Sequence, residues 1–368
     1  MQVLALRARD FRGYPQLEVE LGPGLTVISG PNGAGKTNLL EALYFGCTAR
    51  SCRTANEREV VRFGAAATRV VVAAQGADGP HQLSVGFAPG EPKRIAVDGA
   101  PLDRLLEAAN RPLVSVFLPD RLELIKGAPG IRRAHLDHLV GALWPGRVGT
   151  RRAYAQALAQ RNALIGRIRA GLSARHSLLA WDIQLADHAI ALMGDRASAT
   201  AAVAERYARI GTELDSDEEL SIAYRPRSRA RTREELTAEL SERIDGDLER
   251  GFTAHGPHRD ELLTLRGGRD LRAFGSQGQQ RIALLALLLA EREAIATHRG
   301  AAPLLLLDDV MSELDGPRRH ALVRLLRASG GQAVITTTDL DHVPEGDDPE
   351  VRRLEVSAGR VLGEVLAA

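Results

Sequence analysis

The stretch Gly30-Pro31-Asn32-Gly33-Ala34-Gly35-Lys36-Thr37 decides the fold of this chain of 368 residues. It follows residues 25–29, an apolar run that predicts a β-strand, and it precedes residues 37–44, whose pattern predicts a helix. In such a turn the glycines let successive backbone N–H groups face one point, and the start of the helix adds partial positive charge there. The stretch therefore predicts a phosphate cradle, and a glycine-rich turn that matches the pattern by chance is the alternative.

Two side chains of the cradle carry chemistry of their own. Lys36 can reach the β and γ phosphates of a bound nucleotide as a mobile positive charge. The Thr37 hydroxyl can complete the coordination shell of Mg²⁺, an ion that prefers hard oxygen ligands and is usually bound together with substrate phosphates. We therefore expect all residues from Gly30 to Thr37 to bind the nucleotide, Lys36 to act in catalysis as well, and Thr37 to bind the metal.

A second pattern is the run of four leucines at 304–307 that ends in Asp308 and Asp309. Such a run is typical of a buried parallel strand whose carboxyl end delivers acidic groups to a site. Asp308 suits the contact with Mg²⁺, and Asp309 is placed to orient the attacking water, a positioning role that phosphoryl transfer requires. The alternative is a strand that simply ends in two solvated carboxylates.

A third pattern, Ser276-Gln277-Gly278-Gln279-Gln280, opens a strongly apolar helix predicted over residues 277–297. The serine hydroxyl, the glycine and the free N–H groups of the first turn can form a second anion site. We expect Ser276 and Gly278 to act in catalysis and Gln279 to contact the nucleotide. The alternative for Ser276 is an ordinary helix cap.

The remaining patterns divide the chain into β-rich ends and a helical middle. Strands are predicted at residues 3–8, 17–21, 69–74, 81–87, 94–97, 113–118, 260–266, 303–307 and 332–337. Between residues 131 and 250 the composition changes to Ala, Leu, Arg and Glu, which favours helices, for example at 151–170 and 178–210. We therefore expect one α/β domain formed by residues 1–130 and 251–368, interrupted by a helical lobe at residues 131–250.

Composition limits the possible partners and the compartment. The formal net charge is only +1, so a nucleic-acid partner would need a local basic surface. Two cysteines fit a reducing cytosol, and Arg7 interrupts the opening residues too early for a secretion signal. The longest apolar run, 282–290, is less than half of the roughly 20 residues that span a bilayer. We expect a cytoplasmic protein without a membrane domain.

The order of these motifs resembles that of the ABC ATPases. The cradle comes first, then residues 276–280 where that family has its signature, then Asp308 and Asp309, then residues 312–315 where it has its D-loop. The resemblance implies an α/β fold, an ABC-type P-loop ATPase head with an inserted helical second lobe, and ATP with Mg²⁺ as ligands. It also implies that the signature of one subunit closes on the γ-phosphate held by another, so that ATP binding produces a homodimer.

Within the ABC ATPases, the chain resembles the RecF family over nearly its whole length. Lys36 and Ser276 lie 240 positions apart, more than twice the usual gap in transporter motors, and the helical lobe is too short for a long coiled coil. The blocks that carry the resemblance are residues 10–14, 119–129, 132–137, 256–260, 306–315 and 335–339. The alternatives are a structural ATPase head of a chromosome-organising complex and an ABC transporter motor subunit.

Membership of the RecF family would imply a DNA-dependent function. The protein would bind DNA at gaps and at junctions of single and double strands in an ATP-dependent way. With RecR, and together with RecO, it would promote the loading of RecA and the SOS response.

Several departures from the general ABC pattern bear on the reaction. Asp309 stands where transporters carry glutamate, and residues 336–338 are threonines where transporters carry a histidine. We therefore predict weak, slow, DNA-stimulated hydrolysis of ATP to ADP and phosphate. The glutamine that usually follows a strand is missing after residues 113–118, and Asp120 is the candidate substitute.

Arginines at every second position mark a candidate DNA surface. In an extended segment they would all project to one side and could follow a phosphate backbone, whereas a solvated hairpin is the alternative. They are Arg225, Arg227, Arg229, Arg231 and Arg233.

A few other residues have two open interpretations. Arg12 and Tyr14 could stack on the nucleotide base or simply pack. His258 could act in catalysis or shape a loop, and for His135 and His138 we prefer a structural role to metal binding.

Overall fold

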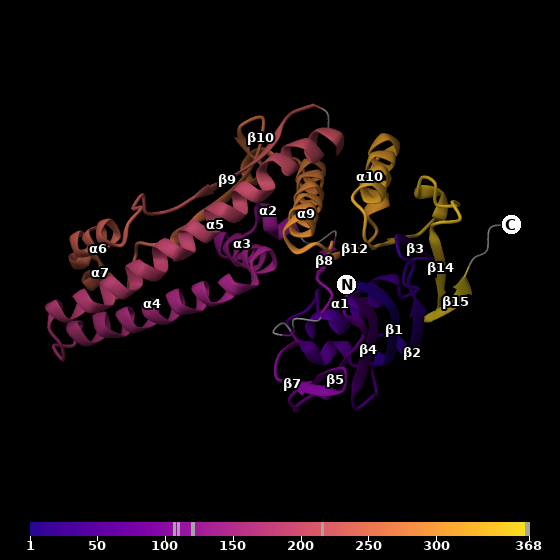
Figure 1. Cartoon of the computed structure of the whole chain (residues 1–368), viewed down its shortest axis with the longest axis horizontal. Coiled ribbons are helices and arrows are strands. Elements are labelled where there is room, and N and C mark those ends of the chain that lie inside the picture. Colours follow the sequence, from indigo (N-terminus) through magenta and orange to yellow (C-terminus); the bar gives the residue numbers. More distant parts are fainter. Residues whose placement is uncertain (106–107, 109–110, 119–121, 215–216, 365–368) are drawn as a thin grey trace. The chain divides into compact units, whose positions relative to one another are not determined.

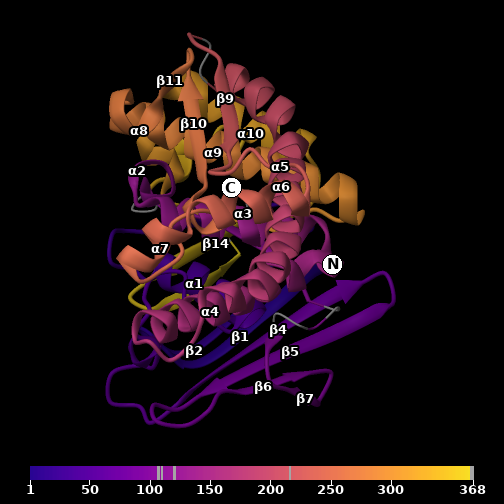
Figure 2. The same ribbon diagram turned by 90° about the vertical axis from the view of Figure 1, so that its left-hand side faces the viewer.

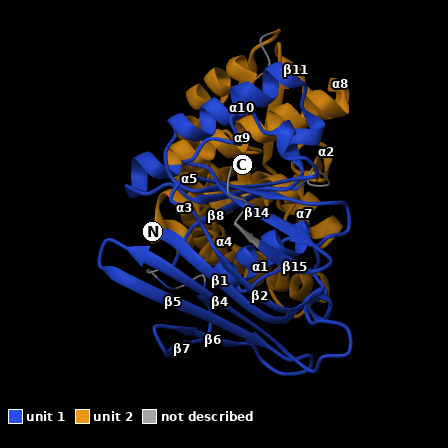
Figure 3. Ribbon diagram, turned by 90° about the vertical axis from the view of Figure 1, so that its right-hand side faces the viewer, with its two compact units in different colours: residues 1–121, 295–368 blue, residues 122–294 orange. Residues whose placement is uncertain are grey.

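The computed structural model describes residues 1–105, 108, 111–118, 122–214 and 217–364. Asp120 therefore lies outside the described residues. The chain forms two compact units (Figure 3), of which unit 1 contains residues 1–121 and 295–368 and unit 2 contains residues 122–294. Unit 2 extends beyond the expected lobe of 131–250 at both ends, because strand β10 (Glu261–Arg266) and helix α2 (Glu123–Lys126) pack within it. The expected domain boundaries stay a prediction.

Unit 1 begins with an antiparallel sheet, whose strands lie side by side in Figure 2. The strand order is β2-β1-β4-β5-β6-β7. Apolar residues alternate along these strands, and the inward ones, such as Val70 and Val72, are fully buried. The strands are β1 (Gln2–Phe11), β2 (Tyr14–Glu20), β4 (Thr68–Gly76), β5 (Gly79–Phe87), β6 (Arg94–Val97) and β7 (Ala100–Leu102).

The second sheet of unit 1 is mostly parallel and has the order β15-β14-β3-β13-β12-β8. Only β15 runs antiparallel to its neighbour. Because β3, β12 and β13 are parallel, their carboxyl ends lie at one edge of the sheet. The strands are β3 (Leu25–Ser29), β8 (Val114–Phe117), β12 (Leu304–Leu307), β13 (Ala333–Thr337), β14 (Arg352–Ser357) and β15 (Arg360–Glu364). The cradle, which follows β3, and the acidic pair, which follows β12, therefore begin at the same edge.

Helix α1 (Lys36–Thr48) lies between the two sheets (Figure 1). It contacts β1, β4 and β5 of the antiparallel sheet and β8 and β13 of the parallel sheet. Leu39, Leu43 and Phe45 are fully buried in this core, and each such side chain contributes about 1.5–3 kcal/mol by leaving water. The core thus anchors the helix whose first turn belongs to the cradle. Helix α10 (Gly316–Ala328) connects β12 to β13.

Two long helices, α4 (Val148–Arg169) and α5 (Leu178–Leu214), run side by side in unit 2 (Figure 1). With 37 residues, α5 is about 55 Å long at 1.5 Å per residue. Among the described residues, no helix combines the length and apolar character that crossing a membrane would require. The other helices that begin in unit 2 are α3 (Pro129–Leu143), α6 (Arg233–Glu242), α7 (Ile244–Arg250), α8 (Leu271–Phe274) and α9 (Gln277–Arg299).

Unit 2 also contains a small antiparallel sheet, which the helical composition of residues 131–250 does not predict. Strand β9 (Leu220–Arg225) pairs with β10, which in turn pairs with β11 (Arg269–Asp270). Arg225 of β9 pairs with Glu261 of β10, 36 positions further along the chain, and this distance explains why the strand is not predicted. The partner of β9 lies far along the chain, so its short apolar alternation is stabilised by tertiary contacts that composition does not record.

Candidate functional site

The backbone of the cradle requires glycine at two positions. Gly30 has φ of 151°, and a Cβ atom there would lie 2.1 Å from the carbonyl oxygen of Val356. Gly35, which caps α1, has φ of 114°, and a Cβ atom there would lie 2.8 Å from the hydroxyl of Tyr14. Any other residue would therefore strain the turn and displace its neighbours.

Tyr14 supports the cradle from inside the fold. Its side chain is fully buried, and its hydroxyl donates a hydrogen bond of 3.0 Å to the carbonyl oxygen of Gly35. Burial raises the pKa of this hydroxyl to about 12, so it stays protonated and can donate. Of the two interpretations of Tyr14, the structure favours packing, because no face of the ring is accessible to a base.

Lys36 points into its own turn. Its side chain is 7% exposed, and Nζ donates hydrogen bonds to the carbonyl oxygens of Gly30 (2.6 Å) and Pro31 (3.0 Å). Burial lowers the pKa of Lys36, while the nearby Asp308 and Asp309 raise it. The ammonium group is thus fixed where the cradle concentrates its N–H groups, and it can exchange carbonyl oxygens for phosphate oxygens.

Asp308 joins the cradle to β13. The Thr37 hydroxyl lies 3.0 Å and 2.9 Å from the two carboxylate oxygens, and the Thr336 hydroxyl donates a bond of 2.7 Å to Oδ1. Burial raises the pKa of Asp308, and the bonds from Thr336 and Thr37 counteract this effect by stabilising the carboxylate. The register places Thr336 next to Ile28 of β3, so three neighbouring strands converge on this carboxylate.

The Thr37 and Asp308 oxygens fit a magnesium ion. They are adjacent hard donors, and Mg²⁺ commonly takes only one or two protein ligands and fills the remaining positions with water and phosphate oxygens. Within the described part of the chain, no cluster of three or more His, Cys, Asp or Glu could hold a metal on its own. A divalent ion here would therefore depend on the phosphates for part of its shell.

Asp309 has a constrained backbone and one free oxygen. Its φ is 44°, in the left-handed region that costs a non-glycine residue about 1 kcal/mol or more. Its N–H donates to Oγ1 of Thr336 (2.9 Å), and its Oδ2 lies 2.9 Å from the Ser312 hydroxyl. Its Oδ1 is buried and has no hydrogen-bond partner among the described residues. Asp309 Oδ1 thus has unused hydrogen-bonding capacity, but it is shielded from solvent in this conformation.

A network around Glu41 borders the cradle, and the sequence motifs do not reveal it. Glu41 is buried on α1 and receives two bonds of 2.8 Å from the Arg12 guanidinium, which makes a base contact by Arg12 depend on breaking an ion pair. Arg53 bonds to Asn38 (3.0 Å), one residue after the metal-site threonine. Arg12 and Asn38 also line a cleft of about 560 Å³, together with the fully exposed Phe63.

The expected signature lies in unit 2. Ser276 and Gln279 cap α9 reciprocally, since the Gln279 N–H donates to the Ser276 hydroxyl (3.2 Å) and the Ser276 N–H donates to Oε1 of Gln279 (2.8 Å). Gly278 is exposed, whereas Gln280 is buried and bonds to the carbonyl oxygen of Leu271 (2.9 Å). Ser276 is thus a cap, and the expected roles of Ser276, Gly278 and Gln279 at a nucleotide stay predictions.

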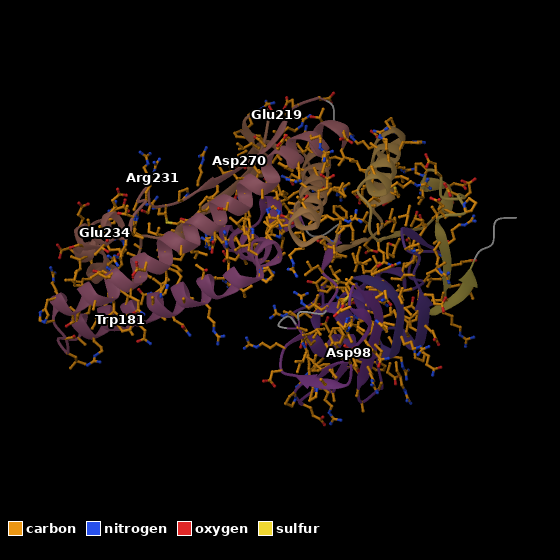
Figure 4. All side chains as sticks on the ribbon, in the orientation of Figure 1. Asp98, Trp181, Glu219, Arg231, Glu234 and Asp270 are labelled. Carbon is orange, nitrogen blue, oxygen red and sulfur yellow. The ribbon has the colours of Figure 1, made fainter. Side chains whose placement is uncertain are left out.

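The arginine segment runs from Arg225 at the end of β9 to Arg233 at the start of α6, and its role as a DNA surface stays a prediction. Ser228 and Ala230 are buried at 1% and 7% exposure, whereas the arginines between and before them are exposed. Figure 4 shows Arg231 pointing away from the ribbon. Arg233 differs, because it begins α6 and pairs with Glu234 at 2.8 Å. The exposed arginines that precede α6 are Arg225, Arg227, Arg229 and Arg231.

The histidines make structural contacts. His258 lies 2.7 Å from the Tyr154 hydroxyl through Nδ1 and 3.0 Å from the carbonyl oxygen of Thr253 through Nε2. Burial lowers the pKa of His258 to about 4, so the ring is neutral at pH 7. His135 contacts Glu291 at 2.6 Å. These contacts favour loop shaping over catalysis for His258.

Comparisons with known proteins agree with this architecture. A family model described as an AAA domain matches residues 5–80. Among solved structures, the recombination mediator protein RecF-ATPrS of the RecFOR pathway has a TM-score of 0.84 at 29% identity, covering 99% of this chain and 98% of that one. An Smc head bound to the C-winged helix domain of ScpA has a TM-score of 0.60 at 15% identity, covering 98% and 96% of the two chains. The expected fold, an ABC-type ATPase head with an inserted lobe, is confirmed.

Two sequence relatives decide the family. The DNA replication and repair protein RecF of Anaeromyxobacter sp. (strain Fw109-5) is 38% identical over 373 residues, covering 98% of this chain and 99% of that protein. The protein of the same name from Myxococcus xanthus (strain DK1622) is 37% identical over 378 residues, covering 98% and 97%. Matches of this extent and identity establish that the chain belongs to the RecF family of DNA replication and repair proteins.

Proposed function

We propose that this protein is an ATP-dependent DNA-binding protein of recombinational repair and replication, which acts in the cytoplasm and hydrolyses ATP slowly. The observation that carries the proposal is the arrangement of Lys36, Thr37, Asp308 and Asp309 at one edge of the parallel sheet. This arrangement supports the roles that the sequence predicts for these groups in phosphoryl transfer. The RecF-ATP and RecF-ATPrS structures among its relatives support ATP as the nucleotide.

The residues would divide the work at the triphosphate. Backbone N–H groups of the cradle, all except that of Pro31, which has none, would bind phosphate oxygens, and Lys36 would contact the β and γ phosphates. Thr37 and Asp308 would hold Mg²⁺, which neutralises charge on the phosphates. Asp309 would orient the attacking water toward the γ-phosphate by accepting a hydrogen bond through Oδ1, once closure of the site exposes this buried, unpartnered oxygen.

The rate of hydrolysis should be low. The Asp309 side chain is one methylene shorter than the glutamate of transporters, so its carboxylate reaches less far toward the γ-phosphate. Thr336 is one of the three threonines at 336–338, where transporters carry a histidine. It is fully buried and already bonded to Asp308 and to the Asp309 N–H. It therefore positions the two acids and has no proton-transfer capacity near pH 7. These features suit a timed clamp better than a motor.

Closure of the site would involve a second copy of the chain. Each chain has one cradle and one exposed signature turn at the start of α9. Pairing the cradle of one copy with Ser276 and Gly278 of the other satisfies both anion sites with one triphosphate. ATP would then assemble a homodimer, and hydrolysis would release it.

DNA would bind through the exposed arginines of the segment 225–231 on unit 2. We place the target at gaps and at junctions of single and double strands, with RecR and RecO as partners in loading RecA and in the SOS response. The description of a relative as a recombination mediator protein of the RecFOR pathway supports this assignment. A structural head of a chromosome-organising complex is the second candidate, and the fold similarity to the Smc head is the observation that favours it.

Light scattering after size exclusion, with and without ATP and gapped DNA, tests the proposal. The wild type should dimerise only with ATP and should bind DNA more tightly as a dimer. Lys36→Met should lose both effects, because the cradle loses its only positively charged side chain. Lys126→Met removes an exposed lysine of α2 and should behave as wild type. A wild-type chain that stays monomeric at saturating ATP and binds DNA regardless of nucleotide would contradict the proposal.

A further inference from the structure

Unit 2 has a hollow of about 310 Å³ lined by Arg227, Ala254 and Arg259. Both arginines are exposed, although they come from different segments, the extended arginine segment and the loop before β10. Among the described residues, neither guanidinium group has an ion pair or a hydrogen bond to a protein acceptor. Two unpaired guanidinium groups at one hollow offer planar donors and positive charge to an anion.

One buried carboxylate holds the two arginine-bearing segments together. Asp260, next to Arg259 in sequence, is 1% exposed, and its Oδ1 accepts a bond of 2.7 Å from the backbone N–H of Arg227. Its Oδ2 accepts bonds from the Tyr224 hydroxyl and from Arg196 (3.1 Å). Asp260 therefore fixes the spacing of the two segments, and its oxygens are already used and do not compete for the guanidinium groups in the hollow.

The loop that carries Arg259 is anchored at its other end as well. The Ala254 N–H donates to buried Asp247 (2.9 Å), and His258 bonds to Tyr154 (2.7 Å). The Arg259 guanidinium lies 5.6 Å from the centre of the Phe252 ring, which limits its rotation. A loop fixed in this way loses little conformational entropy when an anion binds.

Charge around the hollow also favours an anion. Arg133 lies close enough to Arg259 and Arg196 that both neighbours lower its pKa, in addition to the larger effect of burial. Arg133 nevertheless donates to the carbonyl oxygen of Asp260 (2.9 Å) and so belongs to the same rigid group. Asp260 is buried, and the Glu261 carboxylate is paired with Arg132 at 2.7 Å. The charged side chains that line the hollow are therefore the two arginines, Arg227 and Arg259.

We propose that Arg227 and Arg259 together hold a single phosphate of the DNA backbone. The inference rests on the proposed DNA binding of the arginine segment and specifies where one phosphate sits. Arg225, Arg229 and Arg231 would contact other phosphates of the same strand. Arg259, which the alternating pattern does not include, becomes a specific DNA contact, and Arg233 becomes dispensable because it is paired with Glu234.

The test is a double-mutant cycle on binding to gapped DNA, measured by fluorescence anisotropy with ATP at several salt concentrations. Arg227→Gln and Arg259→Gln should each weaken binding about tenfold, as expected for one charge-assisted contact. If the two share one phosphate, the double variant should be little weaker than either single one, and its log–log salt slope should fall by about 0.9. Arg259→Lys keeps the charge without the fork and should fall between wild type and Arg259→Gln.

Arg269→Gln is the control, since Arg269 is exposed but paired with Glu218 at 2.8 Å, and it should bind as wild type. Additive losses with a slope change of about 1.8 would mean two separate phosphates and would overturn the shared pocket. If both single variants bound DNA like the wild type, the shared phosphate pocket would also be overturned. This would hold even if replacing Arg225, Arg229 and Arg231 together abolished binding. In that case the proposed function would survive. If neither the pocket variants nor the triple variant at Arg225, Arg229 and Arg231 changed DNA binding, the arginine segment would no longer be part of the proposed function.

Discussion

Replacing Thr336 with valine tests how the two acids are held, because valine keeps the shape of threonine and removes the hydroxyl. That hydroxyl donates to Asp308 (2.7 Å) and accepts from the Asp309 N–H (2.9 Å), and the residue is fully buried. An unsatisfied buried N–H costs about 1–3 kcal/mol, and a lost bond to a carboxylate costs a similar amount. We therefore expect a loss of about 3 kcal/mol in the free energy of unfolding.

The same change should slow hydrolysis at least tenfold, since a loss of about 1.4 kcal/mol in positioning the acids is sufficient for that factor. It should also change the pH dependence. Burial raises the pKa of Asp308 and the Thr336 bond counteracts this effect, so the valine variant raises the pKa further. Because Asp308 must be ionised to bind the metal, the variant should lose activity at a higher pH than wild type as the pH falls.

Denaturant unfolding and single-turnover hydrolysis across pH measure the two effects separately. Thr336→Ser keeps the hydroxyl and loses one methyl group, so it should cost about 1 kcal/mol of stability and retain wild-type hydrolysis and pH dependence. If Thr336→Val unfolds and hydrolyses like the wild type while Thr336→Ser is impaired, packing of the methyl group would be the relevant property and the reasoning would be wrong.

Two further predictions concern unit 2. Arg161 is fully buried and bonds to two buried carboxylates at 2.6 Å each, so Arg161→Met should lower the free energy of unfolding by about 3–5 kcal/mol in denaturant unfolding. Arg167→Met, at an exposed position of the same helix, should change it by no more than about 0.5 kcal/mol. Equal effects of the two variants would refute a stabilising role of the Arg161 network. His258 has a pKa lowered to about 4, so its contribution to stability is complete above pH 6.5 and is lost as the pH falls from about 6.5 to 4, by at most about 3 kcal/mol. His258→Gln should therefore flatten the decline of the unfolding midpoint over that range, and an unchanged decline would contradict the assignment.

The cradle and the acidic pair can be predicted from sequence because local rules determine them. Gly30 and Gly35 satisfy backbone and packing requirements that only glycine meets, and Asp308 follows four buried leucines at the carboxyl end of β12. Parallel strands then bring the two motifs to one edge without any knowledge of the intervening chain. The two-residue alternation of the arginine segment is also a local property, but its role as a DNA surface stays a prediction.

Partners far apart in the chain cannot be read in this way. Thr336 acts on Asp308 only because β13 lies beside β12, and the order of strands within a sheet is a tertiary property. The ion pair between Arg12 and Glu41, which changes the interpretation of Arg12, joins a β-turn to the middle of a helix. Strand β9 was missed because its partner β10 follows helices α6 and α7. In each case the role of a residue or strand depends on a partner that lies far away in the sequence.

The position of α9 in the chain indicates how nucleotide and DNA could influence each other. The cradle belongs to unit 1 and the exposed arginines belong to unit 2. Helix α9 begins in unit 2 at the signature turn and ends in unit 1, so it is the only helix of the described chain whose residues belong to both. If the signature of one copy closes on the triphosphate of another, the force of closure acts directly on the first turn of α9. ATP held by one copy would then control the DNA surface of the other copy, which makes dimerisation and DNA binding two readouts of one equilibrium.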